Sequence, residues 1–499
     1  MQVDERMGKY PRLILMTILT AVLLGYQPAA GSNNGPQAAI QPPQLLWQNG
    51  GCYSSWCETG WYASPAVVDL DGDGRVEVVG GAYSIFILDG STGDLIDRLD
   101  TPGSRIWPGV VVGDIQEDGK PEIVIAQGGG YLTVYNRQGQ QLWSRQPTPG
   151  NELRSLAASD LDQNGKLELI VASTRSEDQW YVYESDGSVR SGQWPQHGPD
   201  SDTNGYAAGC FNENVAAGDL DGDGLGEIIG PNDTHYIAAF NDDGSQMLAN
   251  TIFGTNPDGS PRFWSRVGFH VDQAVDIRGY AHCGVEHRPN FANSAPTLAD
   301  VNQDGVLETI VVGNVYNCGT DPYTDLYEIP YILNADRTRW KSGPYDWTVL
   351  PSPDGNAAPL SEDYNRIENN VPNPVAVDLD GNGNLEILYP SYDGRMHAFW
   401  LDKTEHGNWP FTVTNPEDGV LSFASEPVVV DLDNNGKAEV IFTTWVEKGS
   451  QRSGKLYILD DLGNPLQVVD LPPAYGGGDW NGAMAAPTQI GRASCRERV

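Results

Sequence analysis

The hydrophobic pattern of the chain consists of short apolar runs separated by polar turns, and this pattern repeats. In one unit the runs lie at 110–112, 122–126, 132–135 and 141–143, and the first two flank an acidic turn. Runs this short, bounded by Gly, Asp and Asn, are typical of β-strands joined by hairpin turns. The pattern therefore predicts an all-β fold built from units of four antiparallel strands.

The acidic turn is a nine-residue loop that occurs seven times. The first copy reads Asp69-Leu-Asp-Gly-Asp-Gly-Arg-Val-Glu77. The copies, numbered here as loops 1 to 7, begin at Asp69, Asp114, Asp160, Asp219, Asp300, Asp378 and Asp431. Four-stranded hairpin units that repeat at this spacing are typical of propeller blades, which stack radially. We predict a β-propeller of four-stranded antiparallel blades, with seven recognisable blades and, as an alternative, a truncated eighth.

The spacing of oxygen-bearing residues in the loop is that of a calcium site. Ca²⁺ takes about six to eight oxygen ligands. Side chains at positions 1, 3 and 5 converge when the chain curls tightly, and the glycine at position 6 permits that curl. Position 7 varies freely, which suits a backbone carbonyl ligand, and position 9 is Glu in every copy. A single copy would be explained equally well as ordinary turn composition, but seven copies with the same Glu favour metal.

The candidate ligands, up to seven Ca²⁺ sites in all, follow from these five positions. In loops 1 to 4 they are Asp69, Asp71, Asp73, Arg75 and Glu77; Asp114, Gln116, Asp118, Lys120 and Glu122; Asp160, Asp162, Asn164, Lys166 and Glu168; Asp219, Asp221, Asp223, Leu225 and Glu227. In loops 5 to 7 they are Asp300, Asn302, Asp304, Val306 and Glu308; Asp378, Asp380, Asn382, Asn384 and Glu386; Asp431, Asp433, Asn435, Lys437 and Glu439. Loops 1 and 4 carry four acids each and are expected to bind tightest. An EF-hand would place its Glu at position 12 between helices.

The unit resembles the FG-GAP or VCBS-type repeat of integrin α-subunit propellers and of many secreted bacterial proteins, over roughly residues 44–490. The segments Gln193-Trp-Pro195 and Asn408-Trp-Pro410 are also similar to bacterial members. The resemblance implies Ca²⁺ in the hairpin between the first two strands of a blade, bound at loop positions 1, 3, 5, 7 and 9. The sequence departs from the family in its amide residues and in carrying the loop in all seven units.

The turns of a blade alternate between two faces of a propeller, so the loops are expected on one face and the insertions 191–213, 252–294 and 342–372 on the other. The insertions carry candidate contact residues for a carbohydrate or protein ligand: Phe263, Trp264, Arg266, His270, Tyr280, His282, Glu286, His287, Tyr345 and Trp347. The more ordinary interpretation, which the sequence favours, is that these aromatics only pack the insertions. A catalytic site at His282, Glu286 and His287 lacks the HExxH spacing.

Composition and the N-terminus limit the setting. Lys and Arg total 30 and Asp and Glu 67, a net charge of −37, which excludes a general nucleic-acid binder. Residues 13–26 are almost wholly apolar and follow Lys9 and Arg12, so we predict a signal peptide at 1–31, with an uncleaved anchor as the alternative. No later run is as apolar, so we expect a secreted or cell-surface monomer without a membrane span. The basic segment 491–499 breaks the pattern and is expected to be an aberrant, truncated end.

Six cysteines are present, and Cys52 and Cys57 are close enough for a local disulfide in an oxidising compartment. Cys210, Cys283 and Cys318 map with them to the insertion face, and Cys495 lies in the tail. Pairing beyond Cys52–Cys57 stays open, with Cys283–Cys318 a weak preference.

Three functions fit the sequence. The leading hypothesis is a calcium-binding module with no chemistry of its own, which binds or adheres to carbohydrate or protein, because every strong signal is structural. The rival is a polysaccharide lyase or hydrolase on a calcium-binding propeller. The third is a propeller fragment of a larger adhesion protein.

Overall fold

The computed structural model describes residues 40–473 and 487, apart from 54–56, 59–62, 174–177, 198–214, 232–235, 278–286, 292–293, 318–326, 353, 362, 364, 368–372, 416, 418 and 451. The chain divides into two units, Met1–Ala39 and Ile40–Val499, and the first lies outside the described residues. The predicted signal peptide and the predicted aberrant tail are also outside the described residues, as are Cys210, Cys283, Cys318 and Cys495.

Short strands make up almost all the regular structure of residues 40–473. The first half holds β1 (Ala66–Val68), β2 (Glu77–Gly81), β3 (Ile85–Asp89), β4 (Leu95–Leu99), β5 (Val111–Gly113), β6 (Glu122–Gln127), β7 (Tyr131–Asn136), β8 (Gln141–Arg145), β9 (Leu153–Ser159), β10 (Glu168–Ser173), β11 (Trp180–Tyr183), β12 (Ala216–Gly218), β13 (Glu227–Pro231) and β14 (Ile237–Phe240). The second half holds β15 (His287–Asn290), β16 (Thr297–Ala299), β17 (Glu308–Asn317), β18 (Tyr327–Leu333), β19 (Lys341–Ser342), β20 (Tyr345–Asp346), β21 (Val375–Val377), β22 (Glu386–Pro390), β23 (Arg395–Phe399), β24 (Phe411–Thr412), β25 (Ser422–Ala424), β26 (Val428–Val430), β27 (Glu439–Val446), β28 (Lys455–Leu459) and β29 (Pro465–Asp470).

Helices are few and short. They are the 3₁₀-helices η1 (Thr251–Phe253) and η2 (Trp264–Arg266) and the α-helix α2 (Gln273–Asp276). Among the described residues, no helix has the length and apolar character needed to cross a membrane.

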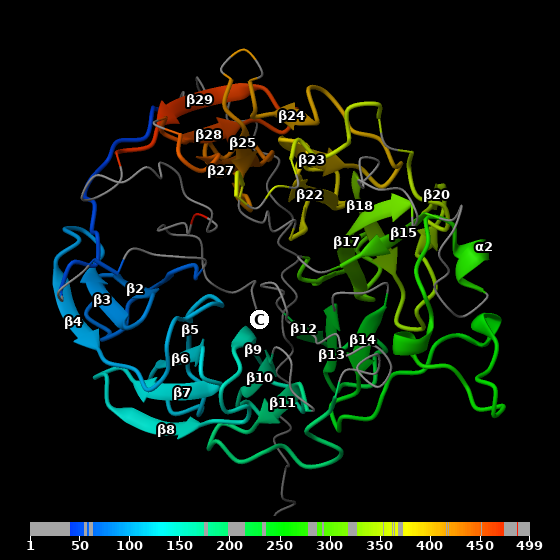
Figure 1. The fold of residues 1–499 in the computed structure, drawn as a ribbon, viewed down its shortest axis with the longest axis horizontal. Helices are drawn as coiled ribbons and strands as arrows, with labels where there is room; N and C mark the ends of the chain where they lie inside the picture. The colour runs from blue at the N-terminus through cyan, green and yellow to red at the C-terminus, as the bar shows by residue number, and fades with distance from the viewer. Residues whose placement is uncertain are drawn as a thin grey trace, which may run out of the picture. The chain divides into compact units, whose positions relative to one another are not determined.

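The strands pair antiparallel in consecutive sheets, which confirms the predicted all-β propeller-type fold. Three sheets run β1-β2-β3-β4, β5-β6-β7-β8 and β21-β22-β23-β24. The strands β9–β11 and β12–β14 form three-stranded sheets, β15–β18 a four-stranded one and β25–β29 a five-stranded one. The first strands contact one another in order, β1 with β5, β5 with β9, β9 with β12, β12 with β16 and β16 with β21. Figure 1 shows the sheets following one another around a common centre.

Not every predicted fourth strand forms. In the unit of loop 4, Gln246 makes only an isolated bridge to Phe240. Val189 and Arg339 make the same kind of isolated bridge, to Tyr183 and Leu333. In these units the chain leaves the sheet edge for an insertion after a few residues, so the edge pairing is not extended. Residues 44–47, before the first sheet, have no strand structure.

The two ends of the described unit meet. Gln48 Nε2 donates to the carbonyl oxygen of Pro473 over 3.0 Å, and Gln467 Nε2 donates to that of Ile40 over 2.7 Å. Gln467 lies in β29, so the N-terminal segment runs beside the last sheet. Side-chain hydrogen bonds therefore join the two ends of the described residues. The part of the chain where a truncated eighth blade would lie, beyond residue 473, falls outside the described residues except for residue 487.

Candidate metal-binding loops

All seven acidic loops have the same place in the fold. Each connects two adjacent antiparallel strands, as loop 1 connects β1 to β2, and the Glu at position 9 is the first residue of the later strand. In loops 5 and 7 a further strand, β15 or β25, precedes this pair. The predicted hairpin position is therefore confirmed. It fixes the Glu backbone in the sheet, so that only its side chain is left to reach the loop.

The aspartate at position 1 organises the loop backbone. In loop 1, Asp69 Oδ1 accepts from the backbone N–H groups of Gly72 and Asp73, and Oδ2 accepts from that of Gly74 over 2.9 Å. Position 1 accepts from the N–H of the position 6 glycine in every loop, over 2.7–3.0 Å. Aspartate is suited to this role because its short side chain binds backbone groups a few residues ahead.

Two positions adopt left-handed backbone. The position 6 glycines have φ between 82° and 92°, as predicted from the curl of the loop. Position 4 is left-handed as well, even where it is not glycine: Glu117 and Gln163 have φ of 57°, and Gln303 and Asn434 of 59°. Sequence reasoning missed this second position, although its frequent glycine was a signal.

Position 5 accepts a backbone hydrogen bond in all seven loops. Its Oδ1 accepts from the backbone N–H of position 7. In loop 1 the N–H of Arg75 donates to Asp73 over 2.8 Å, and in loop 7 the N–H of Lys437 donates to Asn435 over 2.7 Å. An amide oxygen makes this bond as well as a carboxylate does. Asp and Asn therefore exchange at position 5 without loss of the loop, and the exchange changes only its charge.

The glutamate at position 9 is buried in every loop. Its Oε2 accepts from the backbone N–H of position 2, as Glu227 does from Leu220 over 2.7 Å. Burial raises the pKa of Glu227 to about 7 and that of Glu386 to about 8. A cation beside such a buried carboxylate would favour its charged form.

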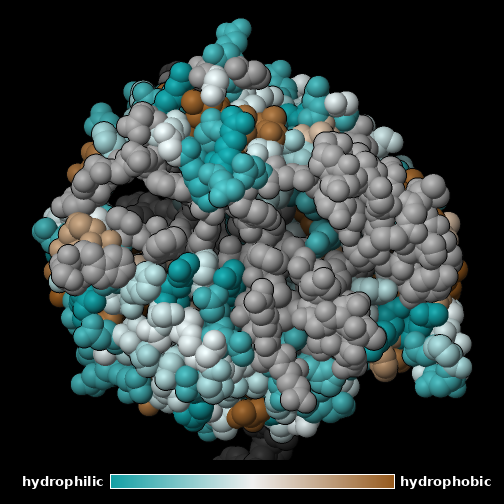
Figure 2. Space-filling view, viewed as in Figure 1, coloured by the Kyte–Doolittle hydropathy of each residue, from teal (hydrophilic) through white to brown (hydrophobic). Residues whose placement is uncertain are grey.

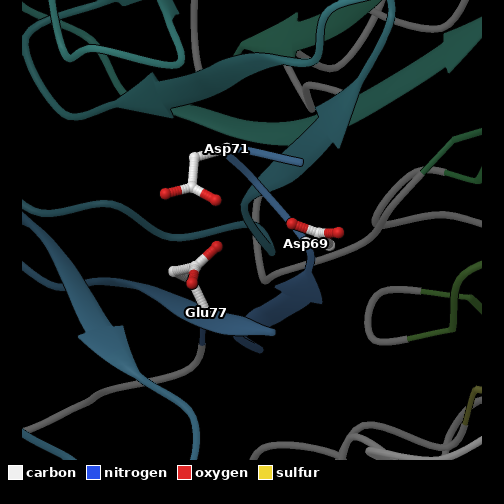
Figure 3. A group of neighbouring side chains, drawn as sticks. All are labelled: Asp69, Asp71 and Glu77. Atoms are coloured by element: carbon white, nitrogen blue, oxygen red, sulfur yellow. The ribbon is translucent and has the colours of Figure 1, made fainter. Parts of the chain in front are cut away.

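Carboxylates converge in five of the loops. One oxygen from each of positions 1, 3 and 9 lies within 4.8 Å of the others in loops 1, 3, 4, 6 and 7. Figure 3 shows this arrangement for Asp69, Asp71 and Glu77. Loops 2 and 5 have Gln116 and Asn302 at position 3, so they offer an amide oxygen in place of the third carboxylate.

Several buried oxygens of these loops have no hydrogen-bond partner. They are Glu168 Oε1 and Asp162 Oδ1 in loop 3, Asn302 Oδ1 in loop 5 and Glu386 Oε1 in loop 6. Buried polar atoms are normally paired, and a bound cation would provide these oxygens with a partner. Hard oxygen ligands of this kind fit Ca²⁺. The residues present therefore fit the group that the loop pattern implies.

Cations from the chain compete for some of the loops. Arg75 Nη2 lies 2.6 Å from Asp73 Oδ2 in loop 1, and Lys120 Nζ lies 2.9 Å from Asp118 Oδ2 in loop 2. Loop 4 has Leu225 at the same position and four acids. Loop 4 is therefore expected to be the tightest site, ahead of loop 1, with which the sequence had ranked it equally.

For two insertion aromatics the structure decides between ligand contact and packing of the insertion, in favour of packing. Trp264 and Trp347 are fully buried and donate from Nε1 to the carbonyl oxygens of Ala335 and Leu401, each over 3.0 Å. Ala335 follows the end of β18, and Leu333 there pairs with Thr309 at the start of β17, so Trp264 lies at the loop end of its sheet. The expectation of ligand contact on the opposite face is wrong for both tryptophans, because each indole N–H requires a buried acceptor.

The other predicted contact residues differ in placement. His270 is buried, with Nδ1 3.1 Å from Asp276 Oδ1, so it is also wrong as a contact residue. Phe263, Arg266 and Tyr345 are half-buried. Tyr280, His282 and Glu286 lie outside the described residues, and of His287 only the backbone in β15 is described.

Sequence reasoning missed an aromatic cluster at the end of the sheets away from the loops. The guanidinium carbons of Arg105 and Arg154 lie 4.4 Å and 4.0 Å from the ring centre of Trp107, within cation–π range. The neighbouring Ile106 bridges to Gln127, the last residue of β6, which sets the cluster at that end. Its residues have no repeated counterpart, so no pattern singled them out.

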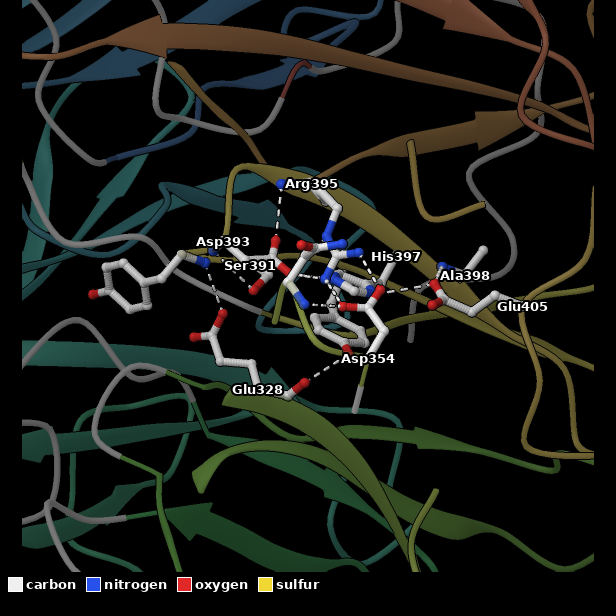
Figure 4. Close-up of polar contacts among 11 residues, drawn as sticks. Glu328, Asp354, Ser391, Asp393, Arg395, His397, Ala398 and Glu405 are labelled. Carbon is white, nitrogen blue, oxygen red and sulfur yellow. Dashed lines mark hydrogen bonds and ion pairs between the residues drawn. The ribbon is translucent and has the colours of Figure 1, made fainter. Parts of the chain in front are cut away.

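A second group of titratable side chains lies around β23 (Figure 4). His397 Nε2 lies 3.0 Å from Asp393 Oδ2, and its Nδ1 lies 3.0 Å from Glu405 Oε1. Arg395 Nε donates to Asp393 Oδ2 over 2.8 Å, and its Nη1 to Asp354 Oδ2 over 2.5 Å. Both cations are buried and held by carboxylates on two sides, an arrangement suited to holding the strand in place.

The sequence matches the FG-GAP-like repeat family over residues 114–171, 160–230 and 378–442. The chain carries FG-GAP-like repeats. The matched stretches contain loops 2, 3, 4, 6 and 7, whose geometry is described above. No curated protein matches the sequence.

Several solved structures are similar to the chain at low identity. The computationally designed Ika8 protein is 11% identical, with a TM-score of 0.45 over 87% of this chain and 92% of its own. BBS1N, solved in complex with ARL6DN, is 9% identical, with a TM-score of 0.40 over 84% and 95%. The quinohemoprotein alcohol dehydrogenase ADHIIG from Pseudomonas putida HK5 is 12% identical, with a TM-score of 0.43 over 86% and 68%. At these scores none of them bears on function.

Proposed function

We propose that this FG-GAP-like repeat protein is a secreted or cell-surface binding module, a propeller that Ca²⁺ stabilises and that binds carbohydrate or protein without catalysing a reaction. The observation that carries the calcium part is the buried glutamate at position 9 of every loop, joined in five loops by two further converging carboxylates. The ions would be held by positions 1, 3, 5, 7 and 9 and would supply the positive charge that these buried oxygens lack.

The non-catalytic part rests on the chemistry of the described side chains. The titratable group around β23 is buried and saturated with ion pairs, and His270 is enclosed with Asp276. The face drawn in Figure 2 is mostly hydrophilic over its described part, which suits a polar ligand. The disulfide between Cys52 and Cys57 is compatible with an oxidising, extracytoplasmic compartment.

The ligand is expected at the end of the sheets away from the loops. Trp107 is itself buried and stacks with the guanidinium groups of Arg105 and Arg154, and Arg154 also pairs with Glu152, so this cluster offers half-buried arginine edges rather than an aromatic face. Aromatic and arginine side chains dominate many binding surfaces. These half-buried arginines take the place of the buried insertion tryptophans as the candidate contact residues.

Calcium removal tests the proposal. A ligand that binds only the folded state adds about 2.7 kcal/mol per site at a hundredfold excess over its Kd. We expect EDTA to lower the melting temperature by well over 5 °C (a shift of about this size corresponds to the loss of about 1 kcal/mol in a small domain), and dialysed protein to retain bound calcium. An unchanged melting temperature with no bound calcium would contradict the metal part.

Binding is tested separately. A glycan array with the calcium-loaded protein is expected to show retention without turnover, and Arg105→Ala is expected to reduce the retention. With pectic substrates, the ultraviolet absorbance of unsaturated products is expected not to rise. Product formation would instead establish the polysaccharide lyase.

A further inference from the structure

Arg190 lies against loop 3, and only 7% of its surface is exposed. Its Nη1 is 3.4 Å from Asp162 Oδ2 and 3.7 Å from Glu168 Oε2. Asp162 and Glu168 occupy positions 3 and 9 of the loop, where metal ligands are expected. A fixed positive charge of the chain therefore touches two of the side chains that would hold a divalent ion.

The same guanidinium binds two further carboxylates. Nη1 lies 3.3 Å from Glu184 Oε1, in the turn after β11. Nη2 lies 3.1 Å from Asp242 Oδ2, and Nε donates to the Asp242 carbonyl oxygen over 3.1 Å. Asp242 belongs to the turn after β14, in the next sheet. Arg190 therefore joins loop 3, its own sheet and the neighbouring sheet through one buried cation.

The following two sheets place apolar residues at the same register position. The backbone N–H of Arg190 donates to Val182 O over 2.9 Å, that of Met247 to Ala239 O over 3.0 Å and that of Trp340 to Ile332 O over 2.9 Å. Met247 and Trp340 are buried in an apolar cluster. Met247 is thus the counterpart of Arg190 in the unit of loop 4, and it brings no charge.

Charge separates the two loops further. Loop 4 has acids at positions 1, 3, 5 and 9, whereas loop 3 has Asn164 at position 5. The affinity of a calcium site rises with the number of its charged ligands, and a neighbouring like charge lowers it. Loop 3 still offers two buried oxygens without partners, Asp162 Oδ1 and Glu168 Oε1. It therefore keeps the capacity to bind an ion, at reduced affinity.

We propose that Arg190 is the resident cation of loop 3, so that this loop binds a divalent ion more weakly than loop 4 and keeps its shape when it is empty. The inference rests on the proposed function, because it presumes that the loops bind calcium. As calcium falls, loop 3 empties before loop 4. The junction between the β9–β11 and β12–β14 sheets nevertheless stays closed, because the Arg190–Asp242 contacts contain no metal.

A reciprocal exchange tests this. Arg190→Met gives loop 3 the residue found beside loop 4, and Met247→Arg gives loop 4 the guanidinium. Equilibrium dialysis with radioactive calcium measures the affinity of the sites. We expect the calcium affinity of one site to rise by about tenfold in Arg190→Met and that of one site to fall by about tenfold in Met247→Arg, because each variant loses or gains one positive charge beside a site. Arg98→Met is the control, because it removes an arginine that pairs with Glu58 away from the loops. It should leave the calcium affinity of both sites unchanged.

Crystals of the unsubstituted protein, grown at a calcium concentration that just fills loop 4, identify the sites. Anomalous scattering is expected at loop 4 and absent at loop 3. Equal occupancy of both loops, or unchanged binding in both exchange variants, overturns the inference. If Met247→Arg, which places a charge in an apolar cluster, does not fold, Arg190→Met and these crystals still decide. Absence of calcium from every loop would contradict the proposed function instead.

Discussion

The indole Nε1 of Trp143 donates to the carbonyl oxygen of Ser185 in the next sheet over 3.0 Å. The same contact between consecutive units recurs with other tryptophans, always to the turn after the third strand. The pairs are Trp47 with Gly90, Trp194 with Asp242, Trp264 with Ala335, Trp347 with Leu401 and Trp409 with Asp461, over 2.9–3.0 Å. Between β4 and the turn after β7, Leu99 lies against Gly139 instead. The tryptophans therefore link consecutive sheets by hydrogen bonds at the end of the sheets that carries the acidic loops.

Trp143→Phe keeps an aromatic ring but removes the donor. We expect the free energy of unfolding to fall by about 1–3 kcal/mol, because a buried carbonyl oxygen loses its partner. Urea unfolding measures the change. Leu142→Ala, at an exposed neighbour, is the control and should stay within about 0.5 kcal/mol. Equal effects of the two substitutions would show that the indole bond does not contribute.

Gly230 in β13 allows the closest approach between two sheets. A Cβ added there would lie 1.9 Å from Cη2 of Trp180, which is fully buried in β11. Gly230→Ala is expected to destabilise the protein by about 1–3 kcal/mol through overpacking. Gly80→Ala, at a glycine of β2 with open space around it, is the matched control and should not destabilise. A melting temperature unchanged by Gly230→Ala would argue against this packing.

His397 gives the stability a dependence on alkaline pH. Burial disfavours its charge, but hydrogen bonds to Asp393 and Glu405 outweigh burial and raise the pKa to about 9. A pKa above the unfolded value of 6.5 means that the stabilisation is fully present below pH 6.5 and is lost as the pH rises through about 9. Burial also raises the pKa of the neighbouring Glu328 to about 8, which acts in the same direction.

We therefore expect the melting temperature at fixed calcium to fall between pH 6.5 and pH 10, and to fall less in His397→Gln. Glu328 is retained in that variant, so the difference between the two curves reports the histidine. His406→Gln is the control, because His406 is more exposed and its substitution should leave the slope as it is. Parallel curves for the protein and His397→Gln would contradict the prediction.

Calcium is expected to stabilise loop 4 more than loop 2. Asp221 supplies a charged oxygen at position 3 of loop 4, whereas Gln116 supplies an amide to loop 2. Asp221→Ala should lower the melting temperature in calcium more than Gln116→Ala does, and the gap should close in EDTA. Thermal melts of both variants in both buffers measure it. A gap that persists in EDTA would assign the effect to the backbone bond between Asp221 and Asp223.

Sequence was sufficient for the repeated parts of this structure. The short strands and the position of the loops between first and second strands follow from local patterns, and the curl at Gly74 and its counterparts follows from glycine chemistry. Such features depend on neighbours in the chain, so one unit predicts the next. The same reasoning correctly placed a disulfide at Cys52 and Cys57.

What could not be predicted depends on contacts between units. Trp264 looked like a surface aromatic because its partner, Ala335, is distant in sequence. Arg190 carried no signal either, since its partners Glu168 and Asp242 lie on different elements. The burial of a side chain inside an insertion depends on the turn that meets it, and no periodicity within the insertion encodes that turn.

The hydrogen bond from the position 2 N–H to the position 9 glutamate occurs in every loop and involves no ion. A newly made chain can thus close each hairpin before it meets any calcium, unlike a zinc finger, whose site forms only with its metal. The ion would then govern the lifetime of the finished ring rather than its assembly, and calcium-free protein should still refold, only to open again sooner.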